Sequence, residues 1–233
     1  MGADEQMLII RRTDFLDKLT PDEYESLNIL HNYVVADKDT YIYFDAQYHN
    51  KLYFVKEGYV RIGNVDDNGE ELVKEILQPG DVFGQFMLER SSMNGEFAQA
   101  HKCDTVLCAF SVPDFERLLT IRPDLSIAFS RKIGAKLRKI ENQLLSLLQK
   151  DVRTRLLHFF WTMLQQGSAN GDNTAQLPNF LTHEDIARLT GTSRQTVTTL
   201  INKFAAEGLI SVDRKSIVFL DIRSLQKQVS AVG

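Results

Sequence analysis

Polar side chains recur between Ser193 and Lys203 at a spacing that places many of them on one face of a helix. The outward positions near its start are predicted to be Arg194, Gln195, Thr196 and Thr199, with Lys203 one turn later. Arginine can donate two hydrogen bonds to guanine, glutamine can pair with adenine, and a threonine methyl can touch a thymine methyl. Ser193, Thr198 and Lys203 are better placed to contact phosphates. Such contacts position the protein on the duplex but do not distinguish one base sequence from another. A polar helix face is usually only solvated, but this combination favours recognition of DNA.

Two short helices are predicted to position these side chains. Thr182 to Asp185 resembles a capping box, with Asp in place of the usual Glu or Gln, and Gly191 can end the helix that follows. Ser193 can cap a second helix, Arg194 to Ala206, with a buried face of Val197, Leu200, Ile201 and Phe204. A small residue at the contact, Ala187, and a Gly in the turn complete a helix-turn-helix pattern. Leu209 to Val212 and Ile217 to Leu220, joined by the polar turn Asp213 to Ser216, predict a β-hairpin wing after it.

Basic residues are concentrated in the half of the chain that contains these helices. Residues 1–130 hold 12 Lys and Arg against 23 Asp and Glu, a net charge of −11, whereas residues 131–233 hold 15 against 8, a net charge of +7. The basic half is the one expected to meet phosphate. Because such a surface can also be merely solvated, the motifs decide between the two interpretations.

The segment from Val34 to about Ser111 has the period-two pattern of β-strands. Apolar residues alternate or form short runs at Leu52–Val55, Val60–Ile62, Leu72–Leu77 and Val106–Phe110. Asp67-Asn68-Gly69 and Pro79-Gly80-Asp81 are turn sequences at hairpin-like spacing. The pattern predicts an antiparallel barrel or jelly roll.

A helical period follows Pro113. Ile133, Leu137, Ile140, Leu144 and Leu147 recur at spacings of 4, 3, 4 and 3, which is a heptad seam. In this frame Lys136 occupies a g position and Glu141 the following e position, where an opposite charge on a partner helix would be reached. The seam predicts a parallel homodimer, and the alternative is that it packs only on the chain's own barrel.

A hinge is predicted at residues 149–152. Asp151 can cap a new helix over Val152–Leu164, and the Gly-, Ser-, Asn- and Asp-rich stretch Gln166–Asn179 is predicted as an exposed loop. The expected organisation is a sensor domain at 1–120, a dimerisation helix at 121–150 and a DNA-binding domain at 151–233.

These motifs together resemble the cyclic-AMP receptor protein and fumarate-nitrate regulator family, or Crp–Fnr family. The resemblance covers nearly the whole chain and is most specific at Thr192-Ser193-Arg194-Gln195-Thr196-Val197. It implies an α+β chain with an N-terminal double-stranded β-helix, a long dimerisation helix and a C-terminal winged helix-turn-helix. It also implies a homodimer on a two-fold symmetric promoter site, with activation through RNA polymerase.

The candidate effector pocket departs from the cyclic-AMP-binding members of that family. It consists of Gly84, Gln85, Lys136 and Ile140. Those members have a Gly-Glu early in the phosphate cassette and an Arg-Ser pair later, whereas here Gln85 follows Gly84 and Gly95-Glu96 stands near the Arg-Ser place. Ile140 and Glu141 replace the adenine-contacting Thr-Ser pair. These departures argue against cyclic AMP and leave the effector unknown, and a regulator without any effector stays open.

Other cofactors find little support in the sequence. An iron-sulfur cluster of the fumarate-nitrate type needs four Cys, and only Cys103 and Cys108 are present. His101 and Cys103 lie on a predicted strand near the place where haem-sensing relatives keep an axial ligand, so haem remains an alternative to ordinary core or edge residues.

Two other functional classes compete with a DNA-binding regulator. A metal-dependent enzyme of the cupin type usually has a His-x-His pair, which the five His do not provide, so neither catalytic nor metal-binding residues are predicted. A cyclic-nucleotide module acting on a protein partner would have no use for a groove-reading helix. Without a signal sequence or long apolar run, no membrane association and a cytoplasmic location are expected.

Overall fold

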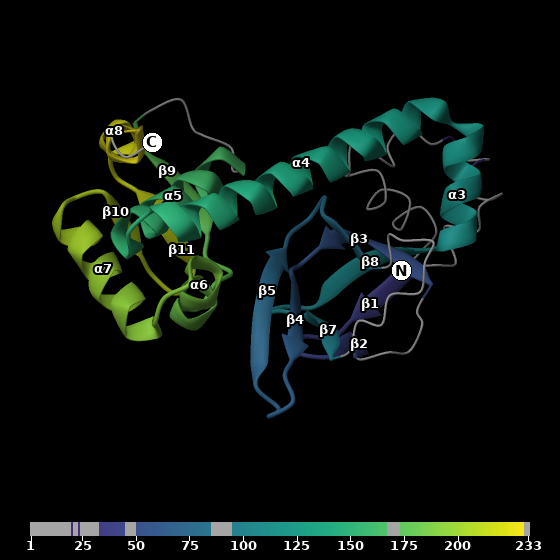
Figure 1. Cartoon of the computed structure of the whole chain (residues 1–233), viewed down its shortest axis with the longest axis horizontal. Helices are drawn as coiled ribbons and strands as arrows, with labels where there is room; N and C mark the ends of the chain where they lie inside the picture. Colours follow the sequence, from purple (N-terminus) through teal and green to yellow (C-terminus); the bar gives the residue numbers. More distant parts are fainter. Residues whose placement is uncertain are drawn as a thin grey trace. The chain divides into compact units, whose positions relative to one another are not determined.

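The computed structural model describes Thr20, Glu23 and residues 33–44, 50–84, 95–166 and 173–230. Contacts divide the chain into two compact units, Met1–Lys136 and Leu137–Gly233, and each is described by itself (Figure 1). Among the helices of the described residues, none is long and apolar enough to cross a membrane.

The first unit is built on two four-stranded antiparallel sheets, as the alternating pattern predicted. One sheet has the order β1-β8-β3-β6 and the other the order β2-β7-β4-β5. The strands are β1 (Tyr33–Ala36), β2 (Tyr41–Phe44), β3 (Lys51–Glu57), β4 (Val60–Val65), β5 (Glu71–Leu77), β6 (Val82–Gly84), β7 (Glu96–Ala100) and β8 (Thr105–Ser111). The predicted turn at Asp67–Gly69 joins β4 to β5, with Gly69 at a positive φ of 81°.

Two apolar clusters hold the described part of this unit together. One contains residues of both sheets, among them Val55, Ile62, Leu77 and Ala98, and therefore lies between them. We call the two sheets, β1 to β8, the roll. The other joins β3, β6 and β8 to α3 (Val112–Ile121) and to the first turn of α4 (Pro123–Gln149). Helices thus cover the outer face of one sheet, which explains why β3 and β8 are apolar on both faces.

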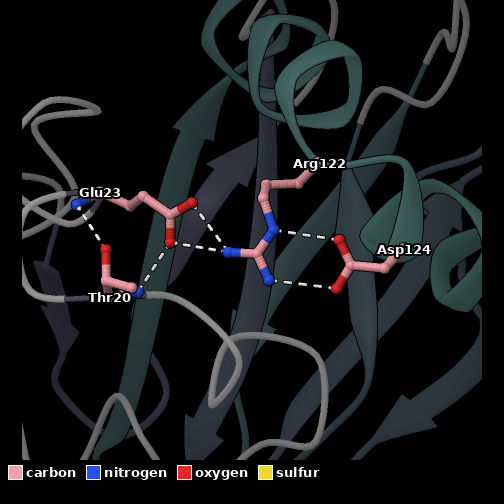
Figure 2. Close-up of polar contacts among 4 residues, drawn as sticks. All are labelled: Thr20, Glu23, Arg122 and Asp124. Atoms are coloured by element: carbon pink, nitrogen blue, oxygen red, sulfur yellow. Dashed lines mark hydrogen bonds and ion pairs between the residues drawn. The ribbon is translucent and has the colours of Figure 1, made fainter.

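Arg122 joins the start of the described chain to the α3–α4 junction (Figure 2). Its guanidinium donates to both Glu23 carboxylate oxygens at 2.8 Å and to both Asp124 oxygens at 3.0 and 3.1 Å. Thr20 and Glu23 form a capping pair, since each backbone N–H donates to the other side chain. These hydrogen bonds hold the pKa of the Glu23 and Asp124 carboxyls below their ordinary values.

The described part of the second unit contains the end of α4, four further helices and a small sheet. They are α5 (Val152–Gln166), α6 (His183–Thr190), α7 (Arg194–Ala206) and α8 (Ile222–Ser230), with β9 (Ala175–Pro178), β10 (Ile210–Val212) and β11 (Ser216–Phe219) in the order β10-β11-β9. The prediction of a loop throughout 166–179 is wrong at β9, where the buried Ala175 and Leu177 pair with β11. A four-residue edge strand inside a polar stretch gives too short a pattern to detect.

Candidate nucleic-acid interface

The helix-turn-helix is built from short-range hydrogen bonds that the sequence predicted. Thr182 and Asp185 form the capping box of α6, with the Thr182 N–H 2.7 Å from an Asp185 oxygen and the Asp185 N–H 3.0 Å from the Thr182 hydroxyl. Gly191 ends α6 in the left-handed conformation, at φ 63°. The Ser193 hydroxyl accepts from the Thr196 N–H at the start of α7. The turn therefore fixes the direction in which α7 leaves α6.

Apolar contacts hold α7 against the rest of the unit. Val197, Ile201 and Phe204 are buried on α7, as is Ala187 on α6, whereas the predicted core residue Leu200 is only half-buried. With this face covered, the opposite face of α7 is directed outward.

The outward face carries the side chains that the sequence singled out. Arg194, Gln195, Thr199 and Lys203 are exposed, as is Ser193 at the cap, and Thr196 and Thr198 are half-buried. The Thr198 and Thr199 hydroxyls donate to the carbonyls of Arg194 and Gln195 at 3.0 Å. Their hydrogens are thus engaged by the helix, so Thr199 can contact a base through its methyl group or through a lone pair of its hydroxyl oxygen.

The wing adds two basic residues that the sequence analysis did not single out. Arg214 and Lys215 are exposed between β10 and β11. The Asp213 carboxylate orders their turn by accepting from the N–H groups of Lys215 and Ser216 at 2.6 and 2.7 Å, and these bonds lower its pKa. A basic pair in the middle of a predicted hairpin turn was the signal that could have revealed them.

Two arginines of α5 bind residues of the helix-turn-helix. Arg155 donates to three carbonyls, those of Lys150 at 2.9 Å, Thr190 at 2.9 Å and Gly191 at 3.0 Å. Arg153 binds both carboxylate oxygens of Glu207 at the end of α7. Asp151 caps α5 as predicted, since its carboxylate accepts from the Thr154 N–H at 2.7 Å.

The end of α4 carries most of the predicted heptad seam. Leu137, Ile140, Leu144 and Leu147 are exposed in the single chain, and Ile133 is half-buried in the first unit. Leu147 also lies against the turn, because a Cβ added at Gly191 would be 2.7 Å from its Cδ2. The Gln143 side chain donates to the Leu189 carbonyl at 3.0 Å. The helix with the seam therefore contacts α6 directly.

Of the candidate effector residues, Gly84, Lys136 and Ile140 lie within the described part of the chain. Lys136 pairs with Glu75 of β5 at 2.8 Å, so its ammonium already has a carboxylate within the chain. Gly84 has a φ of 105°, and a Cβ there would be 2.4 Å from the Lys51 carbonyl oxygen. The backbone therefore needs a glycine at this position, and there is no open space beside it for a side chain. Gln85 lies outside the described residues, and Ile140 belongs to the second unit.

His101 and Cys103 lie in the turn between β7 and β8, which corrects the prediction of a strand there. The Cys103 N–H donates to the His101 carbonyl, and Lys102 between them has a φ of 67°. Within the described parts of the chain, no three potential metal ligands come together.

Each unit of the chain matches the model of a known protein domain family. The model of the Crp-like helix-turn-helix domain matches residues 154–228, and that of the cyclic nucleotide-binding domain matches residues 33–122. The global nitrogen regulator of Synechocystis sp. is 25% identical over 82% of this chain and 86% of its own. The CRP-like cAMP-activated global transcriptional regulator of Mycobacterium tuberculosis is 28% identical over 77% of this chain and 80% of its own. A solved CooA mutant from Carboxydothermus hydrogenoformans has a TM-score of 0.69 at 25% identity, covering 84% and 86% of the two chains.

Proposed function

Because the chain belongs to the Crp–Fnr family of DNA-binding transcription regulators, we propose that it binds a two-fold symmetric promoter site as a homodimer, with α7 in the major groove. The observation that carries this proposal is the α7 face. Arg194, Gln195 and Thr199 are exposed at the start of a helix whose opposite face is buried. A recognition helix of this kind reads base edges with its N-terminal residues.

Base and phosphate contacts are divided along α7 and the wing. Arg194, Gln195, Thr196 and Thr199 would contact base edges, and Ser193 and Lys203 would contact the backbone. Thr198 would contact a phosphate only by turning its hydroxyl hydrogen away from the Arg194 carbonyl. Arg214 and Lys215 extend the basic surface to the wing. Phosphate contacts made by these cations would give an affinity that falls steeply with salt.

The homodimer is supported by the exposed seam on α4. Leu137, Ile140 and Leu144 are each more than half exposed in the single chain. Large apolar side chains repeated at heptad spacing are normally covered by a second helix. A two-fold dimer would present two copies of α7 about 34 Å apart, which is one turn of DNA.

Regulation is assigned to the roll, with α4 and residues 149–152 as the route to the DNA-binding helices. Gln143 and Leu147 of α4 contact α6 and its turn, and Arg155 joins the hinge carbonyl of Lys150 to the same turn. A movement of α4 would thus reach α7. Activity in the cytoplasm and contact with RNA polymerase are what the family implies.

Binding by α7 is tested with duplexes selected from a random pool by the wild-type protein. Arg194→Ala is expected to lose about 1 to 3 kcal/mol and to relax one base position, whereas Lys203→Ala weakens all sequences evenly. Lys227→Ala on α8 is the matched control, because this exposed lysine belongs to a helix that packs on α5. Unchanged affinity and preference in Arg194→Ala would overturn the assignment of α7.

Control by an effector needs a separate measurement. Operator affinity would be compared for protein shown by mass spectrometry to be effector-free, with and without cyclic AMP or cell extract. The expected coupling is about 1 to 3 kcal/mol. Full affinity without ligand, unaltered by additions, would indicate a regulator whose activity follows its concentration.

A further inference from the structure

His183 is a titratable residue at the DNA-binding face that the proposed contacts do not use. It is the first residue of α6 and is half-buried. Its ring nitrogen Nδ1 lies 2.8 Å from the Thr198 hydroxyl oxygen of α7. The two helices lie side by side (Figure 1), so this bond joins the first helix of the motif to the second.

The hydrogen bonds of Thr198 assign the tautomer of this imidazole. A threonine hydroxyl has one hydrogen, and that of Thr198 is directed at the Arg194 carbonyl at 3.0 Å. With its hydrogen directed there, the hydroxyl oxygen accepts from His183, an assignment in which Nδ1 carries a hydrogen. In the neutral ring the other nitrogen, Nε2, is then an acceptor, and it becomes a donor only when the ring takes up a second proton.

The position of the ring favours an anion. Thr198 follows Arg194 by one helical turn, so the two lie on the same flank of α7. The ring also lies at the N-terminus of α6, where backbone N–H groups and the helix dipole attract negative charge. The hydrogen bonds found for the ring within the described residues involve Nδ1, which holds the imidazole while Nε2 is directed away from Thr198.

The neighbouring charges are accounted for on both helices. On α6, Glu184 pairs with Arg188 at 3.0 Å, and Asp185 is engaged in the capping box with Thr182. On α7, Arg194 and Lys203 are exposed. Both acidic groups near the ring thus have partners, and the charges nearest to it on α7 are basic.

We propose that His183 is a proton-dependent phosphate contact, which binds the DNA backbone through Nε2 when the ring is protonated and loses that contact when the ring is neutral. The inference rests on DNA binding by α7 but goes beyond it, because it makes affinity depend on pH. Operator affinity should therefore be higher at about pH 6 than at about pH 8. One linked proton changes affinity by at most about tenfold per pH unit, and a dimer has two such residues.

The test measures operator affinity by fluorescence anisotropy at both pH values and several salt concentrations, with the selected duplex and the full-length protein. Wild type should lose about tenfold or more in affinity at the higher pH, with a smaller salt slope because fewer phosphates are neutralised. His183→Gln should remove this dependence and bind weakly at both values. His183→Arg keeps a permanent donor and should bind equally at both.

Two controls separate this contact from other causes. His101→Gln removes a histidine from the roll and should keep the wild-type pH dependence, and circular dichroism at both pH values checks that each variant is folded. If His183→Gln retains the wild-type pH dependence and salt slope, the inference is wrong, whereas DNA binding by α7 stands. If wild type binds no duplex in the pool at either pH, the proposed function itself fails and the inference with it.

Discussion

The two units of the chain use their cations differently. In the first unit, Arg61, Lys74, Arg122 and Lys136 each lie 2.8 to 3.0 Å from a carboxylate oxygen. In the second unit, the basic residues of the interface are exposed and form no ion pair with any described residue; they are Arg194, Lys203, Arg214 and Lys215. The contrast in net charge between the two parts of the sequence therefore has a local counterpart. These four cations of the first unit pair with the chain's own carboxylates, whereas the exposed cations of α7 and the wing are the ones proposed to contact phosphates.

The largest effect is expected from breaking the seam that would pair two copies. Leu137→Glu combined with Leu144→Glu would place like charges opposite one another in the dimer and leave α7 unpaired with its second copy. Sedimentation should report a monomer, and operator affinity should be lost. Leu145→Glu, an exposed residue outside the seam, is the control. A dimer that persists in the double variant would place the interface elsewhere.

The next largest effect is expected from removing the exposed cations of the wing, compared with removing a paired cation of the first unit. Arg214→Ala with Lys215→Ala is expected to weaken all duplexes and to reduce the salt slope by about 2, since two phosphate contacts would be lost. Lys74→Ala in the roll should leave both quantities unchanged, because Lys74 pairs with Glu96 at 3.0 Å. If both changes lowered the affinity and the salt slope equally, the exposed cations of the wing would not differ from the paired cations of the first unit in their contribution to DNA binding.

A smaller effect is expected at the turn of the motif. Gly191→Ala should lower the free energy of unfolding by about 1 kcal/mol, because a side chain at φ 63° is strained and its Cβ would meet Leu147. Gly134→Ala within α4 has open space at the Cβ and should raise it by about 0.5 to 1 kcal/mol. Denaturant unfolding measures both, and a stabilised Gly191→Ala would contradict the described turn.

The smallest effect concerns the hinge. Burial and the Lys150 ammonium, 2.6 Å from Nε2, lower the pKa of His158. The folded chain therefore favours the neutral ring of His158. The stability that this ring contributes is present above the ordinary histidine pKa of about 6.5, and it is lost as the pH falls through the lower pKa of the folded chain. Thermal unfolding should show a midpoint that falls by a few degrees on acidification in wild type and by less in His158→Gln. The same decrease in both would exclude the hinge pair as its cause.

The parts of the fold that the sequence could predict are those specified by neighbouring residues. Capping pairs such as Thr182 with Asp185, and turn residues such as Gly69 and Gly191, act over a few positions and appear where they were predicted. The first strand of the small sheet, β9, could not be predicted, because its burial depends on pairing with β11 about 40 residues away. Nor could α8, which packs on α5.

The candidate site shows the same division. The exposed face of α7 follows from helical periodicity, so its residues could be named from the sequence. The bond from His183 to Thr198 and the pairing of Lys136 with Glu75 each join elements whose contact only the folded chain reveals. The candidate effector residues stay a prediction, since a pocket depends on such long-range contacts.

The most direct test of the central claim, that α7 reads base edges, is an exchange of preference at Gln195. A glutamine pairs with adenine, whereas a glutamate accepts from the cytosine amino group, and a good pair contributes about 1 to 3 kcal/mol of discrimination. Selection from a random duplex pool by Gln195→Glu should therefore replace adenine by cytosine at one position of each half-site and leave the other positions as in wild type. An unchanged preferred sequence, bound with uniformly altered affinity, would contradict the claim.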